Sequence, residues 1–83
     1  MKTGKNIHNL GSEWCPGSQN WFYLIVDETG KWRVEIEKDY DAPDREGYST
    51  PLAAADFSKH KVYDAPLADA VAKKLSELGL NAG

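Results

Sequence analysis

WFYLIVDETGKWRVEIE, residues 21–37, is the stretch that decides the fold. Its centre, Asp-Glu-Thr-Gly at residues 27–30, is typical of a type I turn followed by a left-handed Gly30, a conformation that glycine enters without steric cost. This turn sets Asp27 opposite Lys31 and thereby fixes every pair that follows. We therefore expect an antiparallel β-hairpin over residues 21–37.

One face of this hairpin is expected to be entirely apolar. The register places three pairs on it: Val26 with Trp32, Leu24 with Val34, and Phe22 with Ile36. Side chains alternate between the two faces of a strand, so a slip of one residue would move charged side chains into the core. The apolar face is therefore expected to form the core of the domain.

The opposite face of the hairpin carries apolar residues on its first strand and charged residues on its second. Trp21, Tyr23 and Ile25 lie across from Glu37, Glu35 and Arg33. A strand that is apolar on both faces is normally covered on both. One interpretation is that an N-terminal arm packs there through Leu10 and Trp14. The other is a binding face built from Trp21, Tyr23 and Arg33, because these residue types are enriched at interface hot spots.

The segments around the hairpin give weaker signals. Residues 1–20 are rich in Gly, Asn and Ser and predict a mostly irregular N-terminal arm, with residues 7–10 compatible with a short strand. The domain proper is therefore expected over residues 21–83. Residues 38–50 predict a polar loop. Residues 51–57 are compatible with a short helix or with a strand, and residues 59–64 predict a further strand.

The C-terminal segment predicts an amphipathic helix. Pro66 falls in its first turn, where a missing N–H does no harm. Gly79 is expected to end the helix and Leu80 to fold back on its last turn. The predicted fold is thus α+β, a small antiparallel sheet of the hairpin and about one further strand, packed against this helix. The helix presents one apolar stripe at a period of 3.6 residues: Leu67, Val71, Leu75 and Leu78.

Composition and charge narrow the range of functions. The chain has 83 residues, which is one domain, and a formal charge of −3. Between residues 35 and 46, six acids stand against two bases, so this segment carries the negative excess. An acidic surface repels phosphate and suits a basic partner. Cys15 is the only cysteine, which excludes an intramolecular disulfide and predicts a reducing, cytoplasmic setting. No apolar run is long enough to span a bilayer, so no membrane segment is expected.

No catalytic, metal or cofactor motif emerges. The surroundings of Cys15 match no nucleophile motif, and no Gly-rich loop opens a helix. The loop acids supply oxygens, but Pro43 occupies the middle of the loop and the later positions do not fit the ligand pattern of a calcium-binding loop. The sequence therefore predicts a chain that is not an enzyme and that holds neither metal nor cofactor.

The function expected from these observations is protein binding by a small acidic regulator or inhibitor, of a kind that phages and mobile elements encode. Homodimerisation through the strand edge, or through Trp21 and Tyr23, is a further alternative. The alternative class is nucleic-acid binding. Residues 30–34, the later strand and the closing helix resemble domains in which a three-stranded sheet reads DNA with the face away from its helix, which would use Trp21, Tyr23 and Arg33. The predicted partner-binding residues are Trp21, Tyr23, Arg33, Glu35, Asp39, Asp41, Asp44 and Glu46.

Overall fold

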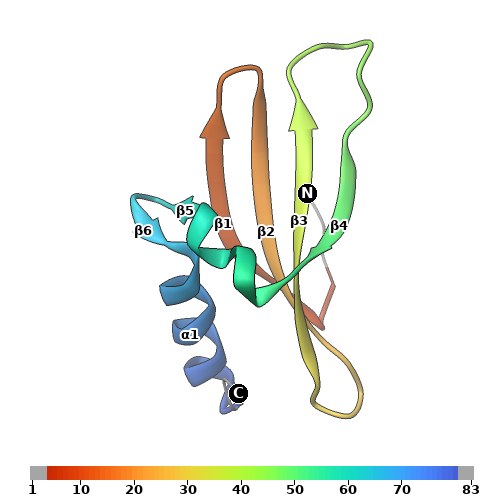
Figure 1. The fold of residues 1–83 in the computed structure, drawn as a ribbon. Coiled ribbons are helices and arrows are strands. Elements are labelled where there is room, and N and C mark those ends of the chain that lie inside the picture. The colour runs from red at the N-terminus through yellow and green to blue at the C-terminus, as the bar shows by residue number, and fades with distance from the viewer. Residues whose placement is uncertain (1–3, 81–83) are drawn as a thin grey trace.

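The computed structural model describes residues 4–80 as an antiparallel sheet with helical elements on one side (Figure 1). The strands β1 (Ile7–Cys15), β2 (Ser18–Val26), β3 (Trp32–Tyr40) and β4 (Tyr48–Leu52) pair in chain order. They are followed by the 3₁₀ helix η1 (Ala54–Lys59), the short strands β5 (Lys61–Val62) and β6 (Ala65–Pro66), and the helix α1 (Leu67–Leu78). The predicted α+β class, with an antiparallel sheet and a C-terminal helix, is confirmed.

The predicted hairpin is present with the predicted register. Strands β2 and β3 pair Val26 with Trp32, Leu24 with Val34, and Phe22 with Ile36. At the turn, the N–H of Asp27 donates to the Lys31 carbonyl at 2.8 Å, and Gly30 has a φ of 86°. The Thr29 hydroxyl donates to Asp27 Oδ1 at 2.7 Å and lowers the pKa of that carboxyl. Turn chemistry and side-chain alternation therefore act together in this hairpin.

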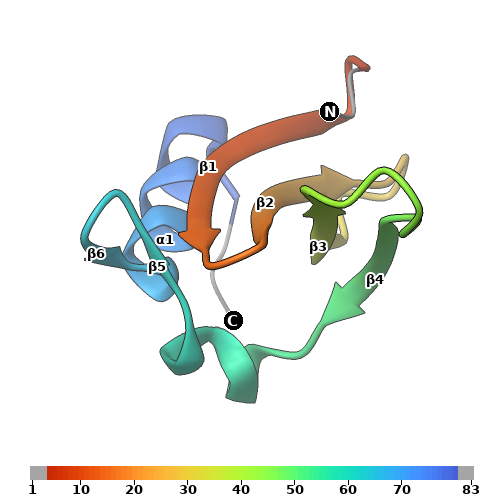
Figure 2. The ribbon, with the colours of Figure 1, turned by 90° about the horizontal axis from the view of Figure 1, so that it is seen from above.

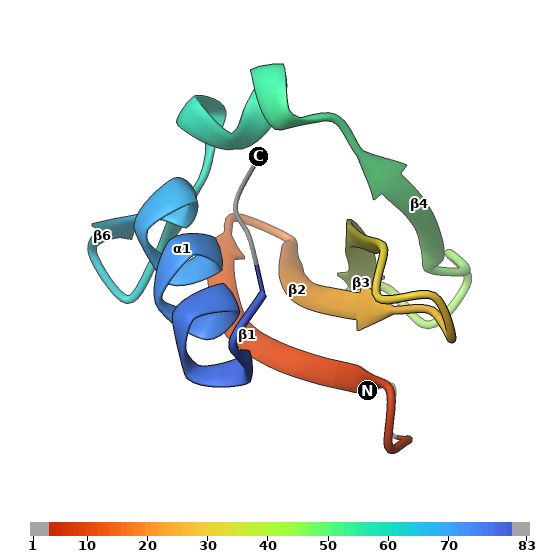
Figure 3. The same ribbon diagram turned by 90° about the horizontal axis from the view of Figure 1, so that it is seen from below.

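The core lies on the predicted face of the sheet. Figures 2 and 3 show the sheet curling so that η1 and α1 lie on its inner side. We call this side the inner face and the other side the outer face. Buried apolar side chains of β2, β3, η1, β5 and α1 pack into one cluster between the sheet and the elements on its inner face. These side chains are Phe22, Leu24, Val34, Ile36, Phe57, Val62, Leu67, Val71 and Leu75.

Helix α1 ends as predicted. The N–H of Leu80 donates to the Leu75 carbonyl at 2.9 Å and the N–H of Gly79 to the Ser76 carbonyl at 3.2 Å, which is a Schellman motif. Gly79 has a φ of 73°. Pro66 is the N-cap, with no side-chain hydrogen bond. The predicted apolar stripe is buried from Leu67 to Leu75, but Leu78 is 38% exposed because the helix runs past the edge of the core there. No helix within residues 4–80 is long and apolar enough to cross a membrane.

The N-terminal segment differs from the expectation of an irregular arm. Residues 7–15 form β1, which pairs with β2 and extends the sheet instead of covering a face. The connecting turn holds Gly17 at a φ of 81°, the value that the third residue of a type II turn requires. The register shifts between Asn9 and Gly11, and Leu10 packs against the core from this bulge. Trp14 is 72% exposed. The interpretation that the arm packs on the outer face through Leu10 and Trp14 is therefore wrong.

Residues 48–66 also differ in detail from the expectation. A strand occupies Tyr48–Leu52, so the polar loop is shorter than predicted, and the expected helix begins later as η1. The predicted strand at residues 59–64 is reduced to β5, which pairs with β6 apart from the main sheet. The cause is a tight turn at Tyr63 and Asp64, whose φ angles are 51° and 69°. This turn reverses the chain immediately after Val62.

Candidate functional site

The outer face brings two tryptophans close together. Trp14 of β1 pairs with Gln19 of β2, and Trp21 pairs with Ser12, so the two indoles are diagonal neighbours on one face. Across β3, Trp21 is paired with Glu37, and Gln19 with Asp39. Trp14 is 72% exposed, whereas Trp21 is half-buried. The register therefore places aromatic and acidic side chains next to each other on the outer face.

Tyr23, a predicted contact residue, is not exposed. Its side chain is 0% exposed, and its hydroxyl donates to Glu37 Oε1 at 2.9 Å. The expectation that this ring lies open on the outer face is therefore wrong. Arg33 is exposed, and its Nε donates to Glu35 Oε2 at 2.8 Å. Its charge is thus partly balanced along its own strand.

We call residues 39–46 the acidic loop; they comprise the last two residues of β3 and most of the segment that joins it to β4, and most of them are exposed to solvent. Its predicted contact residues are all exposed: Asp39, Asp41, Asp44 and Glu46. The N–H of Asp41 donates to the Gly17 carbonyl at 3.1 Å, so the loop is tied to the turn between β1 and β2. The Arg45 guanidinium lies 3.9 Å from the centre of the Tyr40 ring, stacked on it. Within residues 4–80 no three His, Cys, Asp or Glu side chains are arranged to hold a metal ion.

A polar cluster joins β1 to the start of β5. Glu13 Oε2 lies 3.0 Å from His60 Nδ1 and accepts a hydrogen bond from Asn20 Nδ2 at 3.1 Å, while Oε1 accepts from the Lys61 N–H at 3.2 Å. Burial raises the pKa of Glu13, but these hydrogen bonds outweigh it and hold that pKa below 4.5. The His60 ring also packs on Phe22, with centroids 5.3 Å apart. This arrangement orients His60 toward Glu13 and gives the cluster a structural role.

A shallow groove at the β1 edge was not predicted from the sequence. Two strongly exposed aromatic residues line it, Trp14 at 72% and Tyr63 at 76%. Neither the tight turn nor its nearness to β1 could be foreseen, because the pair at residues 63 and 64 contains no Gly or Asn to signal such a turn. We call this the edge groove; it measures about 350 Å³ and is lined by Ser12, Glu13, Trp14, Lys61, Tyr63 and Asp64.

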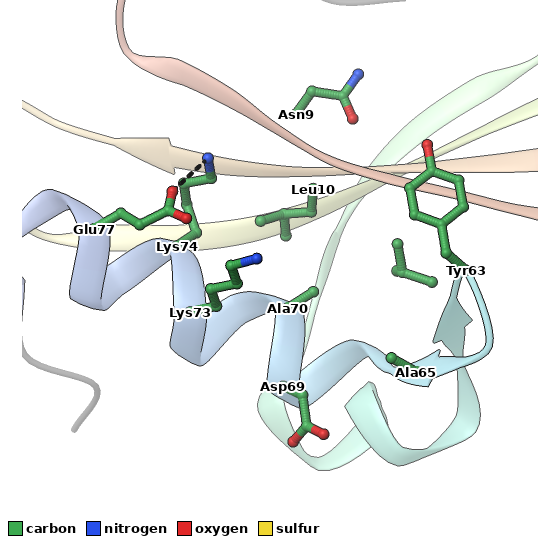
Figure 4. A pocket seen from close by; sticks show the side chains of 10 residues that line it. Asn9, Leu10, Tyr63, Ala65, Asp69, Ala70, Lys73, Lys74 and Glu77 are labelled. Atoms are coloured by element: carbon green, nitrogen blue, oxygen red, sulfur yellow. Dashed lines mark hydrogen bonds and ion pairs between the residues drawn. The ribbon is translucent and has the colours of Figure 1, made fainter.

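A second groove, of about 430 Å³, runs between α1 and β1 (Figure 4). Leu10, Val62 and Ala70 contribute its apolar lining. Its rim carries both signs of charge, and Lys74 Nζ is held by Glu77 Oε2 at 3.1 Å. The mixture of charges favours no class of ligand, so this groove gives no functional indication.

Comparisons of this chain with protein families, with curated proteins and with solved structures found no match. Function must therefore be argued from the geometry described above.

Proposed function

We propose that the chain is a small, non-catalytic protein-binding module, a regulator or inhibitor, that engages a basic partner through its outer face and acidic loop. One observation carries the proposal: Trp14 and Trp21 are diagonal neighbours beside Glu37 and Asp39. Tryptophan is among the residues most enriched at interface hot spots, since it buries a large apolar area and offers an N–H donor. The outer face thus places two aromatic side chains that can bury apolar area beside two negatively charged ones.

The charge of this region defines the kind of partner. Asp39 begins a solvated run of acids that continues through the loop, and the loop is tied to the turn that follows Trp14. Exposed carboxylates contribute little to affinity when paired singly, but as a group they steer a basic surface toward the site and exclude acidic ones. The tryptophans then supply the buried contact. A cytoplasmic setting belongs to the same proposal and is supported by the free thiol of Cys15.

The alternative of nucleic-acid binding has less support. It needs the rings of Trp21 and Tyr23 for base stacking and Arg33 for phosphate. Tyr23 is 0% exposed, and Arg33 is paired with Glu35. Titration with single-stranded DNA at several salt concentrations tests it directly, since phosphate binding weakens steeply with salt.

The test is affinity capture from the cytosol of the producing cells, with four forms of the chain compared. Trp14→Ala removes the exposed anchor, and Asp41→Asn/Asp44→Asn removes two loop charges. Glu28→Gln/Asp69→Asn is the control, because it changes the net charge equally at two exposed positions on other elements. We expect a basic protein that the wild type and the control retain and that the other two variants lose.

Capture of the same protein by all four forms would refute the proposed surface. A circular dichroism spectrum and an unfolding curve for each variant confirm that any loss of binding does not reflect a loss of fold. Both residues of the loop variant and Trp14 are exposed, so little change in stability is expected from these substitutions.

A further inference from the structure

The edge groove has aromatic residues on two elements that are far apart in the sequence. Trp14 comes from β1 and Tyr63 from the turn between β5 and β6, and both line the same groove. Asp64 lines it as well and is exposed, so its carboxylate is available to a ligand. Glu13 adds a second negative charge, with its carboxylate bonded to His60, Asn20 and the Lys61 N–H, and Lys61 is the one cation in the lining. The groove therefore offers two aromatic side chains and an excess of negative charge.

The backbone at this groove is strained. Tyr63 and Asp64 have φ angles of 51° and 69°, a pair of left-handed residues at the centre of a two-residue turn. Such turns favour Asn-Gly, and a bulky residue with a positive φ is uncommon. Strain of this kind costs on the order of 1 kcal/mol or more per residue and is concentrated at functional sites. Stability alone would thus select other residues here.

Gly11 makes room for the Tyr63 ring. A Cβ on Gly11 would lie 2.8 Å from Tyr63 Cε2, closer than real contacts allow. Because Gly11 has no side chain, the Tyr63 ring can lie against the edge strand β1, which also carries Trp14. The strained turn and this glycine together fix the position of an aromatic ring that remains 76% exposed. An ordered but exposed ring is typical of a contact surface.

We propose that the edge groove binds a cationic side chain, Arg or Lys, of the partner protein. The cation is attracted to the π-systems of Trp14 and Tyr63 and pairs with the Asp64 carboxylate. This inference rests on the proposed function, since it assigns the basic residue of the partner to a defined position. The edge groove adjoins the outer face through Trp14, so one partner can contact both.

The test uses an acetylated, amidated hexa-arginine peptide as the probe, followed by ¹H–¹⁵N NMR at physiological ionic strength. We expect the largest shift changes at the Trp14 indole N–H and at the amides of residues 61–64. Trp14→Ala and Asp64→Asn should each weaken binding by about two- to fivefold, as removal of one exposed cation–π or ion-pair contact does. Asn tolerates the left-handed conformation, so Asp64→Asn changes the charge without adding strain.

Tyr48→Ala is the matched control, because Tyr48 is another exposed aromatic residue, at 53%, and lies outside the edge groove. An equal loss of affinity in this control and in Trp14→Ala would overturn the edge groove as the site. Shift changes confined to residues 39–46, unaffected by Trp14→Ala, would also overturn it but leave the proposed basic partner standing. Absence of any shift would count against both proposals.

Discussion

The carboxylate of Glu13 on β1 lies 3.0 Å from Nδ1 of His60, although the two residues are 47 positions apart in the chain. The same carboxylate binds the side chain of Asn20, which is only 3% exposed, and the N–H of Lys61. It thereby holds the start of β5 against the edge of the sheet. Since β5 leads into the strained turn, this contact also positions one wall of the edge groove.

Glu13→Gln should lower the free energy of unfolding by about 1–2 kcal/mol at pH 7, because hydrogen bonds to a charged group are replaced by weaker neutral ones. The folded-state pKa of Glu13 is below its ordinary value of 4.5. The stabilisation is therefore present above that value and is lost as the pH falls through the lower, folded-state pKa. Urea unfolding at pH 7 and at steps below pH 4.5 measures both effects.

In this variant the decrease in stability between neutral and acidic pH should be smaller than in the wild type. Asp27, whose pKa is also lowered, remains in both proteins and serves as the internal reference. Parallel pH profiles for wild type and Glu13→Gln would contradict the assigned role of this carboxylate.

Replacing the strained turn should stabilise the chain. In Tyr63→Asn/Asp64→Gly, both residues suit positive φ angles, so we expect a gain of about 1 kcal/mol in unfolding free energy. Tyr63→Ala is the matched control: it removes the ring but keeps a residue that the left-handed region disfavours, and it should bring no gain. Thermal and urea unfolding of the wild type and the two variants measure these differences in unfolding free energy. A destabilised double variant would show that the Tyr63 ring contributes more by packing than the turn costs.

Gly11→Ala should destabilise the chain by about 2 kcal/mol or more, through overpacking and backbone strain. The new Cβ would lie 2.4 Å from Val62 Cγ1, and the φ of Gly11 is 125°. Gly17→Ala provides the comparison, because Gly17 also has a positive φ, of 81°, but nothing lies within 4 Å of its Cβ position. Only the backbone cost, about 1 kcal/mol, is expected there. Equal losses in the two variants would argue that β5 does not pack against β1 as described.

The hairpin could be predicted because the turn residues and the alternation of side chains between its two faces specify the same register. Of strand β1, only a short strand at residues 7–10 could be suggested, because Gly11 interrupts the strand and the bulge at Leu10 breaks the alternation of apolar and polar side chains on which strand prediction depends. The short β5–β6 hairpin was missed for a different reason: its turn begins with Tyr63, a bulky residue that seldom adopts positive φ, and contains no Gly or Asn. Local pattern reveals pairs of neighbouring strands but not the contacts between distant segments.

In the candidate site, too, residues placed by the hairpin register could be predicted, whereas residues placed by contacts between distant segments could not. Trp21, Glu37 and Asp39 lie where the hairpin register puts them, since their positions follow directly from the pairing of β2 with β3. Trp14 reaches the outer face only because β1 joins the sheet, and Tyr63 lies beside β1 only through the tertiary contact at Gly11.

Tyr23→Phe separates the buried residue of the outer face from the exposed one. The substitution removes the hydroxyl that donates to Glu37 Oε1, at a cost of about 1 kcal/mol in unfolding free energy, while the ring still fills its place. Because the side chain is 0% exposed, affinity for the captured partner should not change. Trp14→Ala should show the opposite pattern, with stability within about 0.5 kcal/mol of the wild type and binding lost. Urea unfolding and a titration with the partner measure the two quantities on the same samples. If Tyr23→Phe weakens binding as strongly as Trp14→Ala, the outer face must open when the partner binds, and Tyr23 is a contact residue after all.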